Sequence, residues 1–320
     1  MSIDTQLTDG GCSPKAPIDV IGDVHGQYDK LVGLLRHLGY HDTGGCWRHP
    51  VRTAVFVGDL IDRGPRQSAT VDLVRRMVDA GAARCILGNH EFNAIAWATP
   101  DPDRPGEHLR RHTPTNCHQH EAFLREVEGT SRYGDIIAWF KTLPLWLDLG
   151  EVRIVHACWH QASMDVIQPS MGQGQTLTEE LIVLGSRKEE PAYRAIETIC
   201  KGPELELPDG IVFTDRDGKK RGEFRIAWWQ QDLSTYRKAA RVPCEDDLKL
   251  IPDAPLPTAL VLDRYVGPPV MFGHYWFDGT PTVISDQFAC LDYSAANQGP
   301  LVAYRWDGES ELSSEKLAWV

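Results

Sequence analysis

Three stretches of sequence decide the fold: residues 18–26 (IDVIGDVHG), residues 54–64 (AVFVGDLIDRG) and residues 85–91 (CILGNHE). In each stretch a short apolar run stops at a glycine, which predicts strands over residues 18–21, 54–57 and 85–87. Helical spacing follows the first two strands, in leucines at positions 31, 34, 35 and 38 and in valines at positions 71, 74 and 78. Gly39 and Gly81 mark the ends of these two helices. The resulting β-α-β-α-β order predicts an α/β fold with parallel strands and right-handed connections.

Polar residues follow each of the three strands, directly after the glycine. They are Asp23, Asp59 and Asn89, each at the start of a longer polar loop. Ligands of open α/β sheets bind beyond the carboxyl ends of the strands, so we expect the three loops to lie along one edge of one sheet. Glycine permits a sharp turn there, after which the next side chain projects at the sheet edge.

The rest of the chain has a weaker pattern. Residues 97–128 are rich in His, Arg and Pro and predict a long excursion, a flap near the site. Residues 168–257 predict mostly helical or irregular structure, with turns at 208–210 and 215–222. We expect a further helix over 136–143 and strands over 152–155, 260–262, 270–272, 282–284, 288–291 and 301–306. No Gly/Ser linker divides the chain, which predicts an N-terminal tail (1–16) and a single domain (17–320) built from two sheets.

The charge balance limits the class of partner. The 320 residues include 33 Lys and Arg against 45 Asp and Glu, a formal net charge of −12. We therefore do not expect extended nucleic-acid binding, which needs clustered positive charge. A nuclease with a local basic groove at Arg104, Arg110, Arg111 and His112 stays open, as does a small phosphorylated substrate, because bound metal ions invert a local field.

Targeting signals are not evident in the sequence. There is no run of about 18 apolar residues, and residues 1–17 lack a basic region followed by an apolar stretch. Eight cysteines are scattered without a CxxC pair, which indicates free thiols in a reducing compartment. These features predict a cytoplasmic protein without a membrane partner; they say nothing of its oligomeric state.

The residues after the strands form a set of metal ligands. They supply oxygen and nitrogen but no thiolate: Asp23, His25, Asp59, Asn89, His156 and His274. Such a set suits Mn, Fe, Zn or Ni better than Ca. Six ligands are too many for one catalytic ion with open positions, and they fit two ions that share a carboxylate. Any one of these residues alone is better explained as a turn cap or a core histidine, so the prediction depends on their conjunction.

The three motifs GDxHG (22–26), GDxxDRG (58–64) and GNHE (88–91) resemble the phosphoprotein phosphatase branch of the calcineurin-like metallophosphoesterases. His156, His274 and the Leu-Pro-Leu at 143–145 fall where that family has similar residues. The resemblance covers about residues 17–160 and 258–306, and residues 165–257 do not align. It implies an α/β fold of two sheets packed as a sandwich and flanked by helices, in α-β-β-α layers.

The resemblance implies a phosphoester hydrolase with two divalent metal ions, Mn before Fe, Zn or Ni. Asp23, His25 and Asp59 would hold the first ion. Asp59 would bridge to the second, which Asn89, His156 and His274 would complete. A metal-bound hydroxide would attack the phosphorus atom in line, without a phosphoenzyme.

Roles in catalysis and substrate binding follow for the neighbouring residues. Arg63 would clamp the nonbridging phosphate oxygens, together with Asn89 and His90. His90 would protonate the leaving oxygen, and Asp62 would hold His90 in the productive tautomer. Glu91 would support the loop. A second phosphate-binding arginine is common in the family, and the sequence does not select among Arg132, Arg187, Arg221, Arg225 and Arg237.

The substrate is open between a phosphoprotein and a nucleotide. Our main interpretation is a serine/threonine-protein-phosphatase-like phosphomonoesterase, because diadenosine tetraphosphatases usually lack an aspartate at the position of Asp62. The alternative is a diadenosine tetraphosphatase-like nucleotide hydrolase. Trp159 and Tyr275 replace residues usual in the family, either as platforms for a base or as packing beside the site. An inactive scaffold and an extra metal site in the histidine-rich residues 117–120 are weaker readings.

Overall fold

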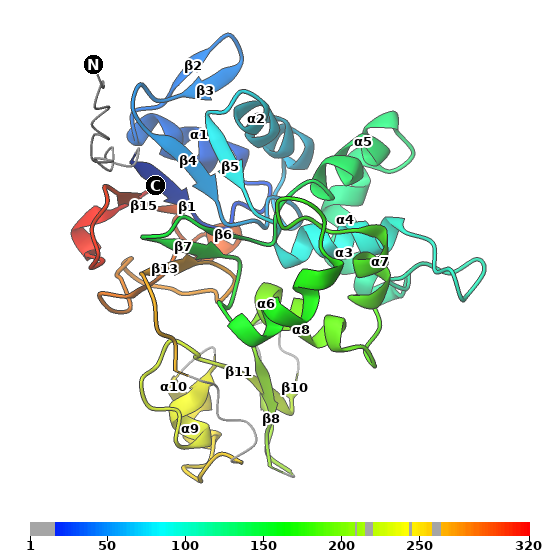
Figure 1. Ribbon diagram of the computed structural model, residues 1–320, viewed down its shortest axis with the longest axis vertical. Helices are drawn as coiled ribbons and strands as arrows, with labels where there is room; N and C mark the ends of the chain where they lie inside the picture. Colours follow the sequence, from blue (N-terminus) through cyan, green and yellow to red (C-terminus); the bar gives the residue numbers. More distant parts are fainter. Residues whose placement is uncertain (1–16, 209, 215–219, 243–244, 258–263) are drawn as a thin grey trace, which may run out of the picture.

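A five-stranded sheet carries the predicted β-α-β-α-β unit (Figure 1). It is seen in a computed structural model that describes residues 17–208, 210–214, 220–242, 245–257 and 264–320. β1 pairs in parallel with β4, and β4 in parallel with β5, as the sequence predicts. Two antiparallel strands extend the other edge. The strand order is β16 (Leu317–Trp319), β15 (Val302–Trp306), β1 (Ile18–Ile21), β4 (Thr53–Phe56) and β5 (Ala83–Cys85).

The two predicted helices connect these strands. α1 (Tyr28–His37) buries its leucines at 31, 34 and 35, and α2 (Gln67–Asp79) buries an apolar stripe that includes Val71 and Val74. The prediction missed a hairpin between the two helices, β2 (His41–Thr43) and β3 (Cys46–Arg48), which turns at two glycines. Its first strand is wholly exposed, so it lacks the apolar alternation that marks a strand in sequence.

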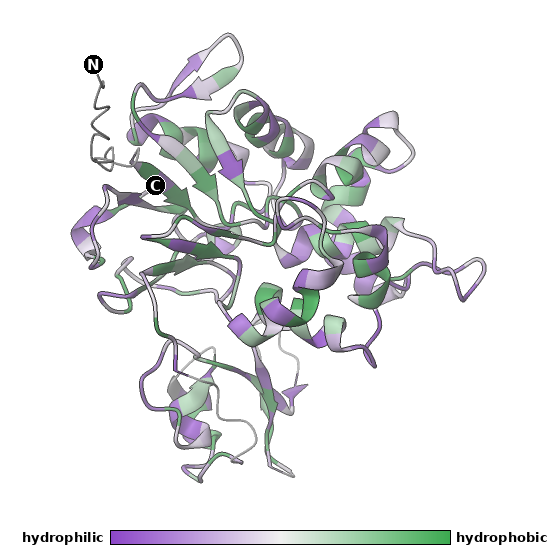
Figure 2. Ribbon diagram, in the orientation of Figure 1, coloured by the Kyte–Doolittle hydropathy of each residue, from purple (hydrophilic) through white to green (hydrophobic). Residues whose placement is uncertain are grey.

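A second sheet of four strands packs against the first. Its order is β14 (Phe288–Cys290), β13 (Val270–Phe272), β7 (Arg153–Val155) and β6 (Trp146–Asp148). One buried cluster fills the space between the sheets, with Val20, Val55 and Tyr304 from the first and Ile154 and Met271 from the second. A larger cluster lies between the sheets' outer faces and the helices. The layers are therefore the expected α-β-β-α sandwich, with apolar strands at its centre (Figure 2).

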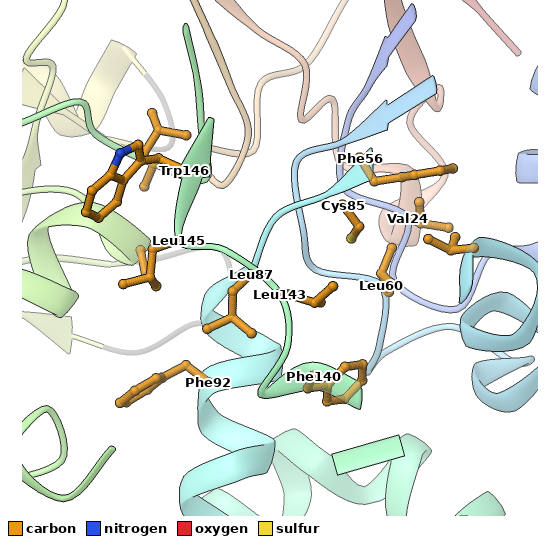
Figure 3. Packing of buried hydrophobic residues seen from close by; sticks show 14 of the residues in the cluster. Val24, Phe56, Leu60, Cys85, Leu87, Phe92, Phe140, Leu143, Leu145 and Trp146 are labelled. Atoms are coloured by element: carbon orange, nitrogen blue, oxygen red, sulfur yellow. The ribbon is translucent and has the colours of Figure 1, made fainter. Parts of the chain in front are cut away.

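Apolar side chains anchor the loops that leave the strands. Val24, Leu60 and Leu87 each lie beside a predicted site residue and are fully buried. They belong to one cluster with Phe56 and Phe140 (Figure 3). Each polar loop is thus fixed by an apolar neighbour in the core, which positions the polar side chains at the sheet edge.

Half of the predicted flap over residues 97–128 is helical. α3 (Asn89–Ala98) begins at the third loop, and α4 (Pro114–Val127) runs for 14 residues and packs on α2. Thr113 caps α4 by accepting the backbone N–H of Asn116, and Pro114 takes the first position. α5 (Ser131–Phe140) follows and confirms the expected helix. The sequence did not indicate α4 as a helix, because charged and histidine residues on its exposed face hide the buried face. A flap near the site stays a prediction.

The segment that did not align contains both helices and a sheet. Its helices are α6 (Gln161–Ile167), η1 (Gln168–Ser170), α7 (Glu179–Leu184), α8 (Pro191–Lys201), α9 (Tyr236–Ala239) and α10 (Glu245–Leu250). An antiparallel sheet joins β8 (Glu204–Glu206), β11 (Glu223–Ile226) and β12 (Ala240–Arg241), beside the short pair β9 (Phe213–Thr214) and β10 (Lys220–Arg221). This sheet has its own small core, with Leu205 and Phe224 at its centre. The expectation of helical or irregular structure is therefore wrong for these strands, which are two to four residues long and too short to show a period.

The strands predicted over residues 270–272, 288–291 and 301–306 are confirmed by β13, β14 and β15, and one prediction in the described C-terminal residues is wrong. Residues 282–284 form no strand, because the N–H groups of Thr282 and Val283 bond to side chains, those of Tyr293 and Ser314. Two short 3-10 turns, η3 (Ala295–Asn297) and η4 (Ser314–Lys316), flank β15. The expected tail at 1–16, most of the turn at 215–222 and the strand at 260–262 lie outside the described residues. Within the described ranges no helix has the length and apolarity needed to cross a membrane.

We predict that Gly22→Ala destabilises the protein. A β-carbon at Gly22 would lie 2.0 Å from the carbonyl oxygen of Leu291, where the two sheets approach at the site edge. We expect the free energy of unfolding to fall by about 1–3 kcal/mol, the usual cost of overpacking. Denaturant unfolding followed by circular dichroism measures it.

Gly134→Ala is the matched control, because Gly134 lies within α5 and a β-carbon there would meet nothing within 4 Å. This variant should be as stable as the parent or gain about 0.5–1 kcal/mol. Equal stability of the two variants would contradict the close approach at Gly22.

Candidate metal centre

Backbone hydrogen bonds join the first two polar loops. The carbonyl oxygen of Asp59 accepts the N–H groups of Val24 (3.1 Å) and His25 (2.8 Å), and the carbonyl of Leu60 accepts the N–H of Gly26 (2.7 Å). The loops after β1 and β4 are therefore held together independently of any ligand.

The third loop is joined to the second by a buried carboxylate. Glu91 accepts the N–H groups of Asp59 (2.8 Å), Leu60 (2.8 Å) and Gly88 (3.0 Å). Burial and the charge of Asp59 raise the pKa of Glu91 to about 7. This geometry agrees with the loop-supporting role implied for Glu91.

Two glycines are required by space at the ligands themselves. A β-carbon at Gly88 would lie 2.3 Å from Oδ1 of Asp59, and one at Gly273 would lie 1.9 Å from Oδ1 of Asp23. Neither residue has the positive φ that marks a glycine-only turn. At these two positions glycine is needed to let a carboxylate touch the backbone.

Strained backbone is concentrated at the site. Nine non-glycine residues of the described chain have positive φ, and five of them are predicted site residues: His25 (46°), Asp59 (50°), Asp62 (69°), Arg63 (70°) and His274 (72°). Such conformations cost about 1–3 kcal/mol each and persist only where the surroundings enforce them. The loops and core thus hold these side chains against a local preference.

Asp59 lies between the histidines. Its Oδ2 is 3.6 Å from Nε2 of His25, and its Oδ1 is 3.3 Å from Nε2 of His156. Two groups of residues with ligand atoms within 4.8 Å of one another occur in the described chain, His25–Asp59–His90 and Asp59–His156–His274. Asp59 belongs to both groups, whereas the predicted ligand Asp23 belongs to neither.

The remaining predicted ligands lie at the edges of these groups. Oδ1 of Asn89 is 3.1 Å from Nε2 of His156. Asp23 accepts the backbone N–H of His274 at Oδ2 (3.1 Å), so its other oxygen stays available. All six predicted ligands are buried, and the structure brings them together from five separate loops.

Hydrogen bonds fix the tautomers of two histidines. The N–H at Nδ1 of His25 donates to the carbonyl of Ile61 (2.8 Å), and that of His156 donates to the carbonyl of Val57 (2.7 Å). In both rings Nε2 is left facing the site, the arrangement typical of metal-ligating histidine. Among the described side chains, Asp23 Oδ1, His25 Nε2 and His274 Nε2 are buried without a hydrogen-bond partner. A buried carboxylate oxygen and buried imidazole nitrogens that lack a partner fit the binding of cations.

The pKa values of buried groups in the site also indicate that a positive charge belongs there. Burial raises the pKa of Asp23 well above its usual value, and the neighbouring carboxylates of Asp292 and Asp59 raise it further. Burial, followed by the charge of His90, lowers the pKa of His25 to about 3, which keeps its imidazole neutral. Buried carboxylates beside neutral imidazoles are costly without a compensating positive charge.

The ring of His90 lies beside the Asp59 carboxylate and the ring of His25. Its Nδ1 is 2.5 Å from Oδ2 of Asp62, and its Nε2 is 3.8 Å from Oδ2 of Asp59. Burial lowers the pKa of His90, but the carboxylates of Asp59 and Asp62 outweigh it and raise the pKa above its ordinary value. In this geometry Nε2 of His90 lies toward Asp59, while Nδ1 is held by Asp62.

Arg63 is held by an aromatic ring. Its guanidinium lies 4.0 Å from the ring centroid of Trp276, a cation–π contact. The backbone N–H of Trp276 donates to the buried Asp292 (2.8 Å), which no sequence signal indicated. Arg63 is thus positioned by the loop that follows His274.

The arginines that the sequence offered as a second phosphate-binding residue have different surroundings in the structure. Arg132 pairs with Asp72, Arg187 with Asp103, and Arg237 donates to the carbonyl of Ile251. Arg225 on β11 is different, because its charge, after burial, lowers the pKa of His274. Its charge therefore acts on His274, one of the predicted ligands.

The structure also decides between alternatives that the sequence left open. Trp159 and Tyr275 are buried, Trp159 beneath Arg153 and Tyr275 against Trp229, so both serve in packing rather than as open platforms. In the histidine-rich residues 117–120, no group of metal-ligating side chains forms in the described structure. Instead His120 is buried and bonds to Asp62 (2.8 Å), an interaction that the sequence did not predict.

Comparisons with known proteins find relatives over part or most of the chain. Over 313 residues the chain is 27% identical to the symmetrical bis(5'-nucleosyl)-tetraphosphatase of Vibrio cholerae, covering 93% of this chain and 98% of that one. It is 48% identical over 73 residues to the asymmetrical bis(5'-nucleosyl)-tetraphosphatase PrpE of Halalkalibacterium halodurans, covering 22% of this chain and only 30% of that relative. A solved structure of a serine/threonine phosphatase from Saccharomyces cerevisiae superposes with a TM-score of 0.46 at 13% identity, over 96% of this chain and 80% of that one.

The family itself is recognised over the part of the chain that carries the three motifs. The model of the calcineurin-like phosphoesterases matches residues 16–182, just over half of the sequence. This span holds β1, β4, β5 and β7 and five of the six predicted ligands. The chain belongs to the calcineurin-like phosphoesterase family.

Proposed function

We propose that this protein is a metal-dependent hydrolase of nucleoside polyphosphates of the bis(5'-nucleosyl)-tetraphosphate class. The observation that carries the proposal is the similarity to symmetrical tetraphosphatases, which runs through 93% of the chain. It includes the region around β8, β11 and β12, which the phosphatase signature does not reach. The alternative substrate class of the sequence analysis is therefore favoured over the phosphoprotein.

The proposed metal ligands follow from the geometry. Asp23, His25 and Asp59 are assigned to one ion, and Asp59 is shared with a second ion. The second ion's further ligands are Asn89, His156 and His274. When bound, two divalent cations attract the phosphate oxygens and make a water molecule acidic enough to act as the nucleophile. The support is the set of orphaned buried atoms on Asp23, His25 and His274. Mn is the proposed metal, and Fe, Zn or Ni also suit these ligands.

The chain's own groups would orient the phosphate and protonate the leaving oxygen. Arg63, stacked on Trp276, is pre-oriented to hold two nonbridging oxygens through its planar fork. The amide of Asn89 lies beside them. His90 would donate the proton at Nε2, while its Nδ1–H stays on Asp62.

Two further guanidinium groups suit a long polyphosphate. Arg110 donates to two neutral amide oxygens, those of Asn93 and Gln119 (2.8 Å each), and its charge reaches Asp62. In contrast, Arg104 and Arg111 are paired with acidic residues of the same loop. Arg110 therefore carries positive charge toward the site that a single phosphate would not need, and Arg225, although also paired with Glu204 (3.6 Å), carries a second charge toward His274.

A phosphomonoesterase acting on phosphoproteins is the second candidate. It is favoured by the short hydrogen bond between Asp62 and His90. His90, oriented in this way, would protonate a poor leaving group such as a serine oxygen. The two candidates share the metal centre and differ in the substrate that they prefer.

A substrate panel tests the proposal. We would compare diadenosine tetraphosphate, a phosphoserine peptide, para-nitrophenyl phosphate and its bis-ester, with Mn²⁺ and with a chelated control. We expect metal-dependent cleavage with the highest kcat/KM for the tetraphosphate. Chromatography of the products then separates symmetrical cleavage (two ADP) from asymmetrical cleavage (ATP and AMP). Preference for the peptide would replace the proposal by the second candidate.

We predict that Asp59→Asn abolishes turnover and metal binding together. The amide has the shape of the carboxylate but not its charge, and Asp59 is the one ligand common to both groups. Calorimetric titration with Mn²⁺ should show loss of both bound ions. Asp29→Asn, on an exposed aspartate paired with Arg66, is the control and should bind metal as the parent does. Full metal binding by Asp59→Asn would refute the bridge.

We predict that Arg110→Gln weakens binding of the tetraphosphate. A lost charged hydrogen bond costs about 1.5–3 kcal/mol, so KM should rise about 10- to 100-fold, with little change for para-nitrophenyl phosphate. Arg111→Gln, a change of the exposed neighbour, should leave both substrates unaffected. A rise in KM for both substrates alike would indicate a general loss of the site rather than a contact with the longer phosphate chain.

A further inference from the structure

We propose that His120 is a positioning residue for catalysis, which holds the Asp62 carboxylate so that Asp62 orients His90 as proton donor. The inference rests on the proposed function, because it assigns a part in the same reaction. It places a residue of α4, 30 positions beyond His90, in a buried chain of three side chains.

Hydrogen bonds join the three side chains directly. The two oxygens of Asp62 are divided between two histidines: Oδ2 to Nδ1 of His90 (2.5 Å) and Oδ1 to Nδ1 of His120 (2.8 Å). Asp62 and His120 are 2% and 3% exposed, so neither bond competes with water. A carboxylate bound at both oxygens cannot rotate about its terminal bond without breaking one of the hydrogen bonds.

The backbone of Asp62 is fixed by the same part of the fold. Its N–H donates to the side chain of Gln67 (2.7 Å), at the start of α2. Glu126 on α4 accepts the backbone N–H groups of Gln67 and Ser68 (2.8 Å each). α4 is therefore attached both to the carboxylate of Asp62 and to the segment that carries it.

The ring of His120 is itself held in place. It lies against Phe123 (5.0 Å between centroids) and Trp97 (5.8 Å), and Trp97 stacks on His112 (3.7 Å). These contacts come from α3, α4 and the loop between them. Packing on this scale leaves a side chain one rotamer.

The electrostatics support an acceptor at Asp62. Burial raises the pKa of this carboxyl, but hydrogen bonds from His120 and His90 outweigh it and lower the pKa to about 2. Asp62 is then ionised and accepts from both rings. If His120 were absent, Oδ1 would be buried without its donor, and a water molecule or a turned carboxylate would replace the arrangement.

The experiment compares leaving groups. We would use the para-nitrophenyl and phenyl esters of the phosphate type that the wild-type protein hydrolyses. Para-nitrophenolate leaves without a proton, whereas phenolate depends more on the acid. We expect His120→Ala to lower kcat for the phenyl ester about 10- to 100-fold, with KM and Mn²⁺ affinity unchanged, and to change kcat for the para-nitrophenyl ester less than about 3-fold.

Two further variants separate positioning from mere packing. The amide of His120→Asn has a donor near the place of Nδ1 and should restore most of the activity, whereas that of His120→Gln extends past it and should not. The double variant His90→Ala/His120→Ala should be no slower than His90→Ala alone. His118→Ala, on the exposed face of the same helix, is the control. If His120→Ala does not fold, the comparison of Asn with Gln decides.

The results that would overturn the role of His120 differ from those that would overturn the proposed function. Equal loss for both esters, or additive losses with His90→Ala, would overturn the role of His120 while the proposed function stands. Hydrolysis of no phosphate ester by the wild-type protein would overturn the proposed function, and with it this inference.

Discussion

The position of the Asp59 carboxylate is the constraint on which the rest of the site depends. Asp59 has a left-handed backbone, and its N–H and carbonyl are both used to hold neighbouring loops. Its oxygens lie near three histidines and accept the N–H of His90 (3.0 Å). Such a residue cannot relax toward solvent, because the loops on both sides are bonded to it. The glycine at position 88 is required for the same reason, since any side chain there would displace the carboxylate.

The proposed metal ligands could be singled out from the sequence because they obey a local rule. Each lies one to four residues after the end of a strand, and parallel strands bring their ends to one edge. The strands themselves were found within two residues, since β1, β4 and β13 are short, mostly apolar runs that are followed, directly or one residue later, by a glycine. Local patterns of this kind carry the position of a side chain along the chain, and the topology supplies the rest.

What could not be predicted depends on contacts between distant elements. His120 reaches Asp62 across 58 residues, from a helix whose exposed face resembles a loop. Asp292 bonds to backbone groups beside His274, and Arg110 is placed by two amides. The strands around residues 204–241 pair over three residues or fewer, too few for a period. In each case the deciding interaction is tertiary, and no residue nearby in sequence signals it.

The two halves of the site also come from different parts of the chain. The proposed metal ligands all stand at the ends of strands in the two central sheets. The groups around them that could distinguish one phosphate ester from another stand elsewhere: His120 on α4, Arg110 just before it and Arg225 on β11. β11 lies outside the strand-end loops, whereas α4 is bonded to the second loop through His120 and to the start of α2 through Glu126. The groups proposed to select the substrate thus lie apart from Asp59, the proposed bridging carboxylate, and substrate class has to be sought outside the three strand-end motifs.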